Sequence, residues 1–210
     1  MIHKTKIRCR IISMSVFASD PNARLPWLTP NRAKILESIL VVIEIGEQSN
    51  RSVTQFDIAK TIFLADYRHL QDYGRPVTYD NFHAMKNGPV PSQTYDMLKP
   101  SFAWESMGLD RAPWATREID RNVREFVRPI RSANRSKLSE SDIAALERAF
   151  SDVKAMGFSK TSDFTHQIAA YKEAWGSRGM SNAKPMNLKT LLPDFDDEMI
   201  ENLEFASKHI

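Results

Sequence analysis

The stretch from Asp57 to Lys99 has the sequence DIAKTIFLADYRHLQDYGRPVTYDNFHAMKNGPVPSQTYDMLK, and its apolar residues first follow helical spacing. Thr54 followed by Asp57 approximates a capping box, so we expect a helix over about residues 55–72. Gly74-Arg75-Pro76 ends this helix, because glycine tolerates the left-handed C-cap and proline disfavours a helical residue before it. One apolar stripe predicts that this helix is the most buried in the protein: Phe56, Ala59, Phe63, Tyr67 and Leu70.

The second half of the stretch is rich in proline and polar residues. Residues 77–86 are expected to be extended, as a short hairpin or wing, and the rigid turn Asn87-Gly88-Pro89-Val90-Pro91 follows. Ser92 is then expected to cap a short helix that runs through Leu98, before Pro100 ends it.

Capping signals predict further helices on both sides of this stretch. Asn31, after Pro30, is expected to cap a helix over residues 31–45. Ser139 with Asp142 predicts a helix that stops at Gly157. One or two short helices follow within 159–175, and Asp194 and Asp197 are candidate caps of a last helix. The fold class is therefore mainly α, a compact helical domain with at most a small β-hairpin or wing.

Residues 113–128 are predicted to form a basic amphipathic helix. Pro113 suits its first turn, and the apolar positions recur at helical intervals. The arginines share another face, which is either a docking surface for phosphate or an acidic protein, or a solvated face held by weak intrahelical ion pairs. This face supplies the candidate partner-binding residues: Arg117, Arg121, Arg124 and Arg128.

Length and composition limit the function classes. The 210 residues, 42% hydrophobic and 26% charged, fit one globular domain with extensions. The single Cys9 excludes an internal disulfide, and seven scattered glycines form no nucleotide-binding loop. Positive charge is concentrated in residues 1–36, with seven lysines and arginines against one acidic residue, and in 101–137, with eight against five. No apolar stretch reaches the length of about 20 residues that spans a bilayer, so no membrane partner is expected.

No motif predicts catalysis. The five histidines lack metal-ligand spacing, and no serine stands in a nucleophile elbow. Asp66 with His69, and Asp163 with His166, are one helical turn apart, and such pairs usually make surface or capping hydrogen bonds. We therefore expect a protein that is not an enzyme, with no catalytic residues, cofactor or metal.

Several motifs occur in a characteristic order. KxxFLAD spans Lys60–Asp66, YGRPVT spans Tyr73–Thr78 and GPVPSxxYDxL spans Gly88–Leu98. LSESDIAAL at Leu138–Leu146 and FSKTSDFTHQIAAYKEAW at Phe158–Trp175 follow. This combination resembles the Panacea domain, also called the SocA-like antitoxin domain.

The resemblance divides the chain into three parts. It covers residues 31–176, within which 101–137 is a basic insertion. Residues 1–30 are a loosely held basic arm, of which residues 1–13 are an upstream extension if translation begins at Met14, and 177–210 are a C-terminal tail with a short helix. The resemblance and the physics of these residue types make the signature mainly structural: Asp57, Lys60, Asp66, Gly74, Pro76, Gly88, Pro89, Pro91, Tyr95, His166 and Trp175.

Membership of this family would imply a cytoplasmic bacterial or phage antitoxin. Such a protein neutralises a toxin encoded by an adjacent gene through direct contact, and the family's toxins include translation-blocking enzymes similar to alarmone synthetases. The alternatives are a proteolytic adaptor that delivers the toxin to a protease, and a DNA-binding autoregulator. Residues 37–100 carry a net charge of −2 (six basic against eight acidic residues), which disfavours the DNA interpretation. An enzyme that acts on the toxin or its product is a third possibility.

Overall fold

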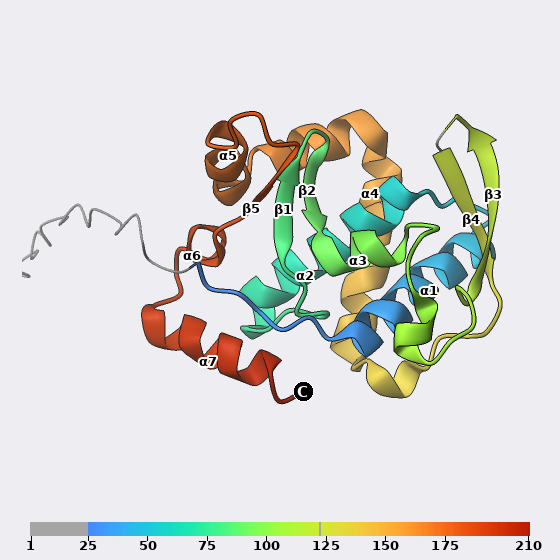
Figure 1. Cartoon of the computed structure of the whole chain (residues 1–210), viewed down its shortest axis with the longest axis horizontal. Coiled ribbons are helices and arrows are strands. Elements are labelled where there is room, and N and C mark those ends of the chain that lie inside the picture. The colour runs from blue at the N-terminus through green and yellow to red at the C-terminus, as the bar shows by residue number, and fades with distance from the viewer. Residues whose placement is uncertain (1–24, 122) are drawn as a thin grey trace, which may run out of the picture.

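The computed structural model describes residues 25–121 and 123–210, and helices dominate this part of the chain (Figure 1). Two short 3₁₀ helices, Trp104–Met107 and Arg135–Lys137, flank the strands of a hairpin. The α-helices are α1 (Arg32–Gln48), α2 (Gln55–Tyr73), α3 (Ser92–Met97), α4 (Glu140–His166), α5 (Ala169–Gly176), α6 (Leu188–Leu191) and α7 (Asp197–Ser207). The strands are β1 (Phe82–Met85), β2 (Gly88–Pro91), β3 (Trp114–Asp120), β4 (Val123–Pro129) and β5 (Ala183–Pro185).

Helix α2 forms as its sequence predicts. The Thr54 hydroxyl accepts a hydrogen bond from the Asp57 N–H at 3.3 Å, and the Asp57 carboxylate accepts one from the Thr54 N–H at 2.8 Å, which confirms the capping box. Gly74 ends the helix with φ of 68°, in the left-handed conformation. The helix packs against α4, and Ile62 and Phe63 are completely buried. Burial of these apolar side chains stabilises the packing of α2 in the core.

Two more predicted caps are confirmed, on α1 and α4. Asn31 accepts a hydrogen bond from the Lys34 N–H at 3.0 Å at the start of α1. Ser139 and Asp142 form the capping box of α4. Gly157, with φ of 71° and ψ of −176°, interrupts α4, so the predicted stop there is a kink between two helical segments.

A three-stranded antiparallel sheet lies beside α2, in the order β2-β1-β5. The expected rigid turn at 87–91 is wrong for residues 88–91, because these residues pair with β1 as strand β2. The two prolines fit there because β2 is at the edge of the sheet, where a missing N–H removes no ladder bond. On the other side, Ala84 pairs with Lys184 of β5, so the C-terminal segment completes the sheet.

The predicted amphipathic helix at 113–128 is wrong. Strands β3 and β4 form an antiparallel hairpin, which stands beside α1 at one end of the molecule (Figure 1). Its β-branched and aromatic residues suit a pleated surface, and Phe126 anchors it: the ring is 1% exposed, and its N–H donates to the Val53 carbonyl at 2.7 Å. The prediction of at most a small β-hairpin or wing is therefore too low, because the fold contains this hairpin in addition to the three-stranded sheet.

The segments at both ends of the described chain pack together. The Leu28 N–H donates to the Asn81 side-chain oxygen, and the Asn81 amide donates back to the Leu28 carbonyl, each at 2.9 Å. The Trp27 N–H donates to Glu204 of α7 at 2.6 Å. Residues 25–30, expected to be loosely held, are thus fixed by tertiary contacts. The rest of the predicted arm, with Cys9 and Met14, lies outside the described residues.

Candidate partner-binding site

Lys60 connects α2 to the β1–β2 turn. Its side chain is 1% exposed, and its Nζ donates to the Pro89 carbonyl at 2.9 Å. Burial disfavours the ammonium form and lowers the pKa of Lys60 to about 7. Gly88, with φ of 101°, lies against this group: a Cβ there would clash with Lys60 Nζ and lie 2.6 Å from Thr165 Oγ1. Only glycine allows the turn to approach the lysine so closely.

Two buried aspartates hold the segment that follows α2. Asp66 accepts hydrogen bonds from the Thr78 N–H at 2.8 Å and from the Thr78 hydroxyl, and burial raises the pKa of Asp66 to about 7. Asp80 accepts bonds from the Gln93 N–H at 3.0 Å and the Thr94 N–H at 2.7 Å. The expected cap by Ser92 is therefore wrong, because the carboxylate of Asp80 caps α3 from a distance in the sequence.

Asp142 is the centre of a third buried group. It accepts hydrogen bonds from Lys34 at 2.7 Å and Arg75 at 2.9 Å, in addition to the backbone of its own capping box. Burial alone would raise the pKa of Asp142, but the bonds from Lys34, Ser139 and Arg75 outweigh it and hold the pKa below its usual value. This single carboxylate thereby joins α1, the α2–β1 segment and α4.

The one-turn Asp/His pairs do not act as pairs. Asp66 bonds to Thr78, whereas His69 contacts the Arg75 carbonyl at 2.7 Å and the Ser141 hydroxyl at 3.1 Å. His166 stacks on Tyr171, with ring centroids 4.5 Å apart. Buried His69 therefore makes tertiary hydrogen bonds rather than the surface or capping bond expected from its spacing.

The remaining signature residues lie in different local environments. Pro76 is buried after the α2 C-cap, and Pro91 is the backbone N-cap of α3. The Tyr95 ring lies 4.8 Å below the Lys99 ammonium. The Trp175 ring lies 3.6 Å from the Arg178 guanidinium and stacks near Tyr171.

The four candidate arginines belong to the hairpin and not to one helix face. Arg117 forms an ion pair with Glu125, and Arg124 donates to the Leu98 carbonyl at 3.0 Å. Arg121 and Arg128 are exposed and form no ion pair among the residues that the structure describes. The expected continuous face is thus replaced by two arginines with intramolecular partners and two that face solvent.

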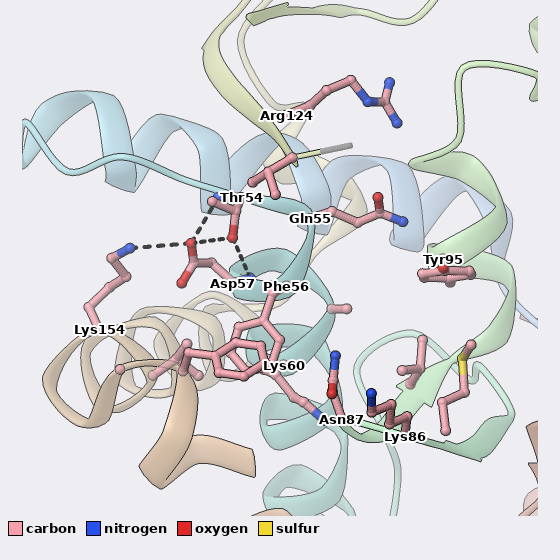
Figure 2. Close-up of a pocket in the computed structure, with 17 residues that line it drawn as sticks. Thr54, Gln55, Phe56, Asp57, Lys60, Lys86, Asn87, Tyr95, Arg124 and Lys154 are labelled. Atoms are coloured by element: carbon pink, nitrogen blue, oxygen red, sulfur yellow. Dashed lines mark hydrogen bonds and ion pairs between the residues drawn. The ribbon is translucent and has the colours of Figure 1, made fainter. Parts of the chain in front are cut away.

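A pocket of about 560 Å³ opens beside the tip of the β3–β4 hairpin (Figure 2). Its walls come from the first turns of α2, the β1–β2 turn, the start of β4 and the kink of α4. Phe56 and Phe158 lie side by side in the pocket, with ring centroids 4.5 Å apart. Thr54, Asp57 and Lys154 form the hydrogen-bonded corner that Figure 2 shows with dashed lines.

The pocket is cationic. Lys60, Lys86, Arg124 and Lys154 line it, whereas Asp57 is the one carboxylate in its lining. That carboxylate is already engaged by the Thr54 cap, and it lies 3.3 Å from Lys154 Nζ. Even without Lys60, whose pKa is lowered to about 7, the lining has three cationic side chains against one carboxylate, which favours an anionic occupant.

Sequence reasoning missed Lys86, Lys154 and Phe158 as site residues. The backbone break at Gly157 was the only local signal, because it ends the regular helix directly before Phe158. The other contributors come from segments separated by tens of residues, so their meeting depends on the packing of α2, α4 and the hairpin.

Among the described residues, no group of three or more histidine, cysteine, aspartate or glutamate side chains is placed to hold a metal ion. None of the helices in the described ranges is long and apolar enough to cross a membrane.

Comparison with known proteins gives one family. The family model described as "Antitoxin SocA-like, Panacea domain" matches residues 58–172, which is more than half of the chain and includes the hairpin. No curated protein and no solved structure matches the chain.

Proposed function

The chain belongs to the SocA-like Panacea antitoxin family, and from that premise we propose that it neutralises a cognate toxin by direct protein binding. Family membership suggests the antitoxin role and a toxin partner. The toxin is encoded by an adjacent gene, and a translation-blocking enzyme similar to alarmone synthetases is one candidate. Neutralisation by steric occlusion requires no bond-making by the antitoxin.

The outer surface of the hairpin supports direct binding. Ile119 is 48% exposed and Ile130 is 50% exposed, and the solvent-facing Arg121 and Arg128 belong to the same hairpin region. A combination of apolar side chains and arginine is typical of protein interfaces, where charged lysine and glutamate are less frequent. The hairpin is anchored in the core by Phe126, so it presents this surface without a large ordering cost.

A proteolytic adaptor and a DNA-binding autoregulator are the two alternatives to steric occlusion. A proteolytic adaptor would bind the toxin in the same way and then deliver it to a protease. An autoregulator would bind operator DNA, but the net charge of −2 over residues 37–100 weakens that candidate.

The central experiment expresses the neighbouring reading frame alone and together with this protein. We expect growth arrest in the first case, rescue in the second, and co-purification of the two proteins. A harmless neighbour, or rescue without any complex, would contradict direct neutralisation. If the toxin keeps a constant abundance during rescue, neutralisation occurs by occlusion; if its abundance falls, neutralisation occurs by proteolytic delivery.

The surface is tested by the double variant Arg121→Glu/Arg128→Glu. These arginines are preferred to Arg117 and Arg124 because the latter two make intramolecular bonds. We expect the affinity for the toxin to fall at least about tenfold, since two charges at the interface are reversed. The matched control is Lys172→Glu/Lys208→Glu, which makes the same change in net charge on α5 and at the end of α7. Equal affinity of both double variants would contradict this docking surface.

A further inference from the structure

The pocket and the exposed hairpin surface share strand β4. Val123 and Arg124 of β4 form a wall of the pocket, and β4 also carries Arg128 of the hairpin surface. A protein that docks on the hairpin would therefore be bound to the strand that also forms one wall of the pocket.

The pocket has apolar walls that the chain itself leaves uncovered. Phe158 is 57% exposed and Val123 is 38% exposed, although both line a concave site. A volume of about 560 Å³ lies within the range of cavities that enclose a ligand, about 300–1,000 Å³. An apolar side chain of a partner would remove these surfaces from water, which is favourable by about 25 cal/mol per Å².

The positive groups divide into engaged and available ones. Lys60 donates to the Pro89 carbonyl, and Lys154 donates to the Ser52 carbonyl at 2.7 Å and lies near Asp57. Lys86 is exposed and has no ion-pair partner in the described ranges, and Arg124 is bonded only to the neutral Leu98 carbonyl. Figure 2 shows Lys86 and Arg124 on opposite sides of the pocket. An anion at this rim would gain charge partners without displacing an internal carboxylate.

We propose that this pocket receives an acidic and apolar segment of the partner toxin. An aromatic or aliphatic side chain of that segment packs against Phe56 and Phe158, and a neighbouring carboxylate pairs with Lys86. This inference rests on the proposed function and adds the chemistry of the segment that is recognised. An apolar anchor in a pocket with charges at the rim is the arrangement that concentrates binding energy in interfaces.

A protein segment fits these features better than nucleic acid does. Nucleic acid is bound over extended cationic surfaces that follow its phosphates, whereas the available cations here flank one apolar cavity. Because β4 belongs to both the pocket wall and the hairpin, an occupant that is part of the docked protein is favoured over a free small anion.

The test uses the full-length protein and the toxin identified by co-purification. Lys86→Glu reverses the rim charge, and Val123→Trp fills the pocket mouth from an exposed position. We expect each variant to bind the toxin at least tenfold more weakly by calorimetry, with an unchanged thermal unfolding midpoint. The matched controls are Lys208→Glu for charge and Met180→Trp for bulk, the latter at a fully exposed position, and both should bind like the wild type.

A second experiment, with peptides, identifies the segment of the toxin that binds. Overlapping 15-residue peptides that cover the toxin sequence are titrated into the full-length protein, and we expect binding by one that contains acidic and large apolar residues. Replacement of its acidic residue by alanine should weaken binding to the wild type, but not to Lys86→Glu. If the toxin binds wild type, Lys86→Glu and Val123→Trp within twofold, this inference is overturned while the proposed function stands. Binding that requires a co-purifying small anion instead of any peptide also overturns it, and failure of the wild type to bind the toxin overturns the proposed function.

Discussion

Helices α1, α2 and α4, here called the frame, differ from the β3–β4 hairpin in where their charged side chains lie. In the frame, Lys60, Asp66 and Asp142 are buried, and each is held by a hydrogen bond to another segment of the chain. On the hairpin, Arg121 and Arg128 face solvent. Buried ionisable groups are costly unless they are paired, so the frame tolerates little change. Exposed charges contribute little to stability, so the hairpin surface is free to be shaped by its partner.

The largest effect is expected when the charge at the centre of the frame is removed. Asp142→Ala leaves Lys34 and Arg75 without their carboxylate and removes half of the α4 capping box. We expect a loss of about 3–5 kcal/mol in the free energy of unfolding, measured by urea denaturation.

The matched control for Asp142 is Asp152→Ala. Asp152 also forms an ion pair, with Arg68 at 2.6 Å, but its side chain is 41% exposed. Its removal is expected to cost less than about 1 kcal/mol. Equal losses in the two variants would show that burial does not distinguish the two pairs.

A pH-dependent effect of comparable size is expected at Asp66. The folded state raises the pKa of Asp66 from 3.8 to about 7, so between these values the folded protein holds a proton that the unfolded chain has lost. This contribution to stability is complete below pH 3.8 and disappears as the pH rises to 7. Asp66→Asn does not titrate, and its amide can still accept from the Thr78 N–H.

The measurement compares the free energies of unfolding of wild type and Asp66→Asn at several pH values. We expect the wild type to lose stability relative to the variant by up to about 1.4 kcal/mol per pH unit between pH 4 and 7, and to change little above pH 7. A difference that is constant over this range would mean that Asp66 is ionised in the folded protein throughout.

A smaller effect separates the anchor of the hairpin from its surface. Phe126→Leu is expected to cost about 1–2 kcal/mol, because the ring fills the core between the hairpin and the rest of the protein. Val127→Ala, at a 39% exposed neighbour, should stay within about 0.5 kcal/mol. Similar losses for both would indicate that the hairpin is not anchored on one face. Thermal and urea unfolding measure the difference.

The smallest effect on stability is expected from Arg121→Glu/Arg128→Glu. The free energy of unfolding should change by no more than about 0.5 kcal/mol, since both side chains are exposed. A loss of several kcal/mol would show that this surface also supports the fold, and would remove the contrast between the hairpin and the frame.

Local signals in the sequence predicted the frame well. The caps at Asn31, Thr54 and Ser139 and the C-cap at Gly74 were identified correctly, because each interaction spans only a few residues. The hairpin was mistaken for a helix because its apolar residues, spaced four and three apart, fit both a helical stripe and a strand pair interrupted by a turn and bulges.

The candidate site was predictable only in part. The arginines of residues 117–128 were singled out by charge, and Arg124 does line the pocket. Lys86, Lys154 and Phe158 carried no local signal that linked them to one another or to α2. The packing of α4 on α2 and the kink at Gly157 bring Lys154 and Phe158 to α2, and the packing of β2 against α2 and α4 brings Lys86 there.

The sequence by itself determined the family, the predominantly helical class and most helix ends, since these depend on short motifs and on hydrogen bonds within a turn. Tertiary structure alone decided that residues 114–129 form a hairpin, that Asp80 caps α3 and that a cationic pocket lies between α2, α4 and β4. Each of these outcomes depends on groups that are distant in the chain, and a group gains its partner or its burial only when the whole domain has closed around it.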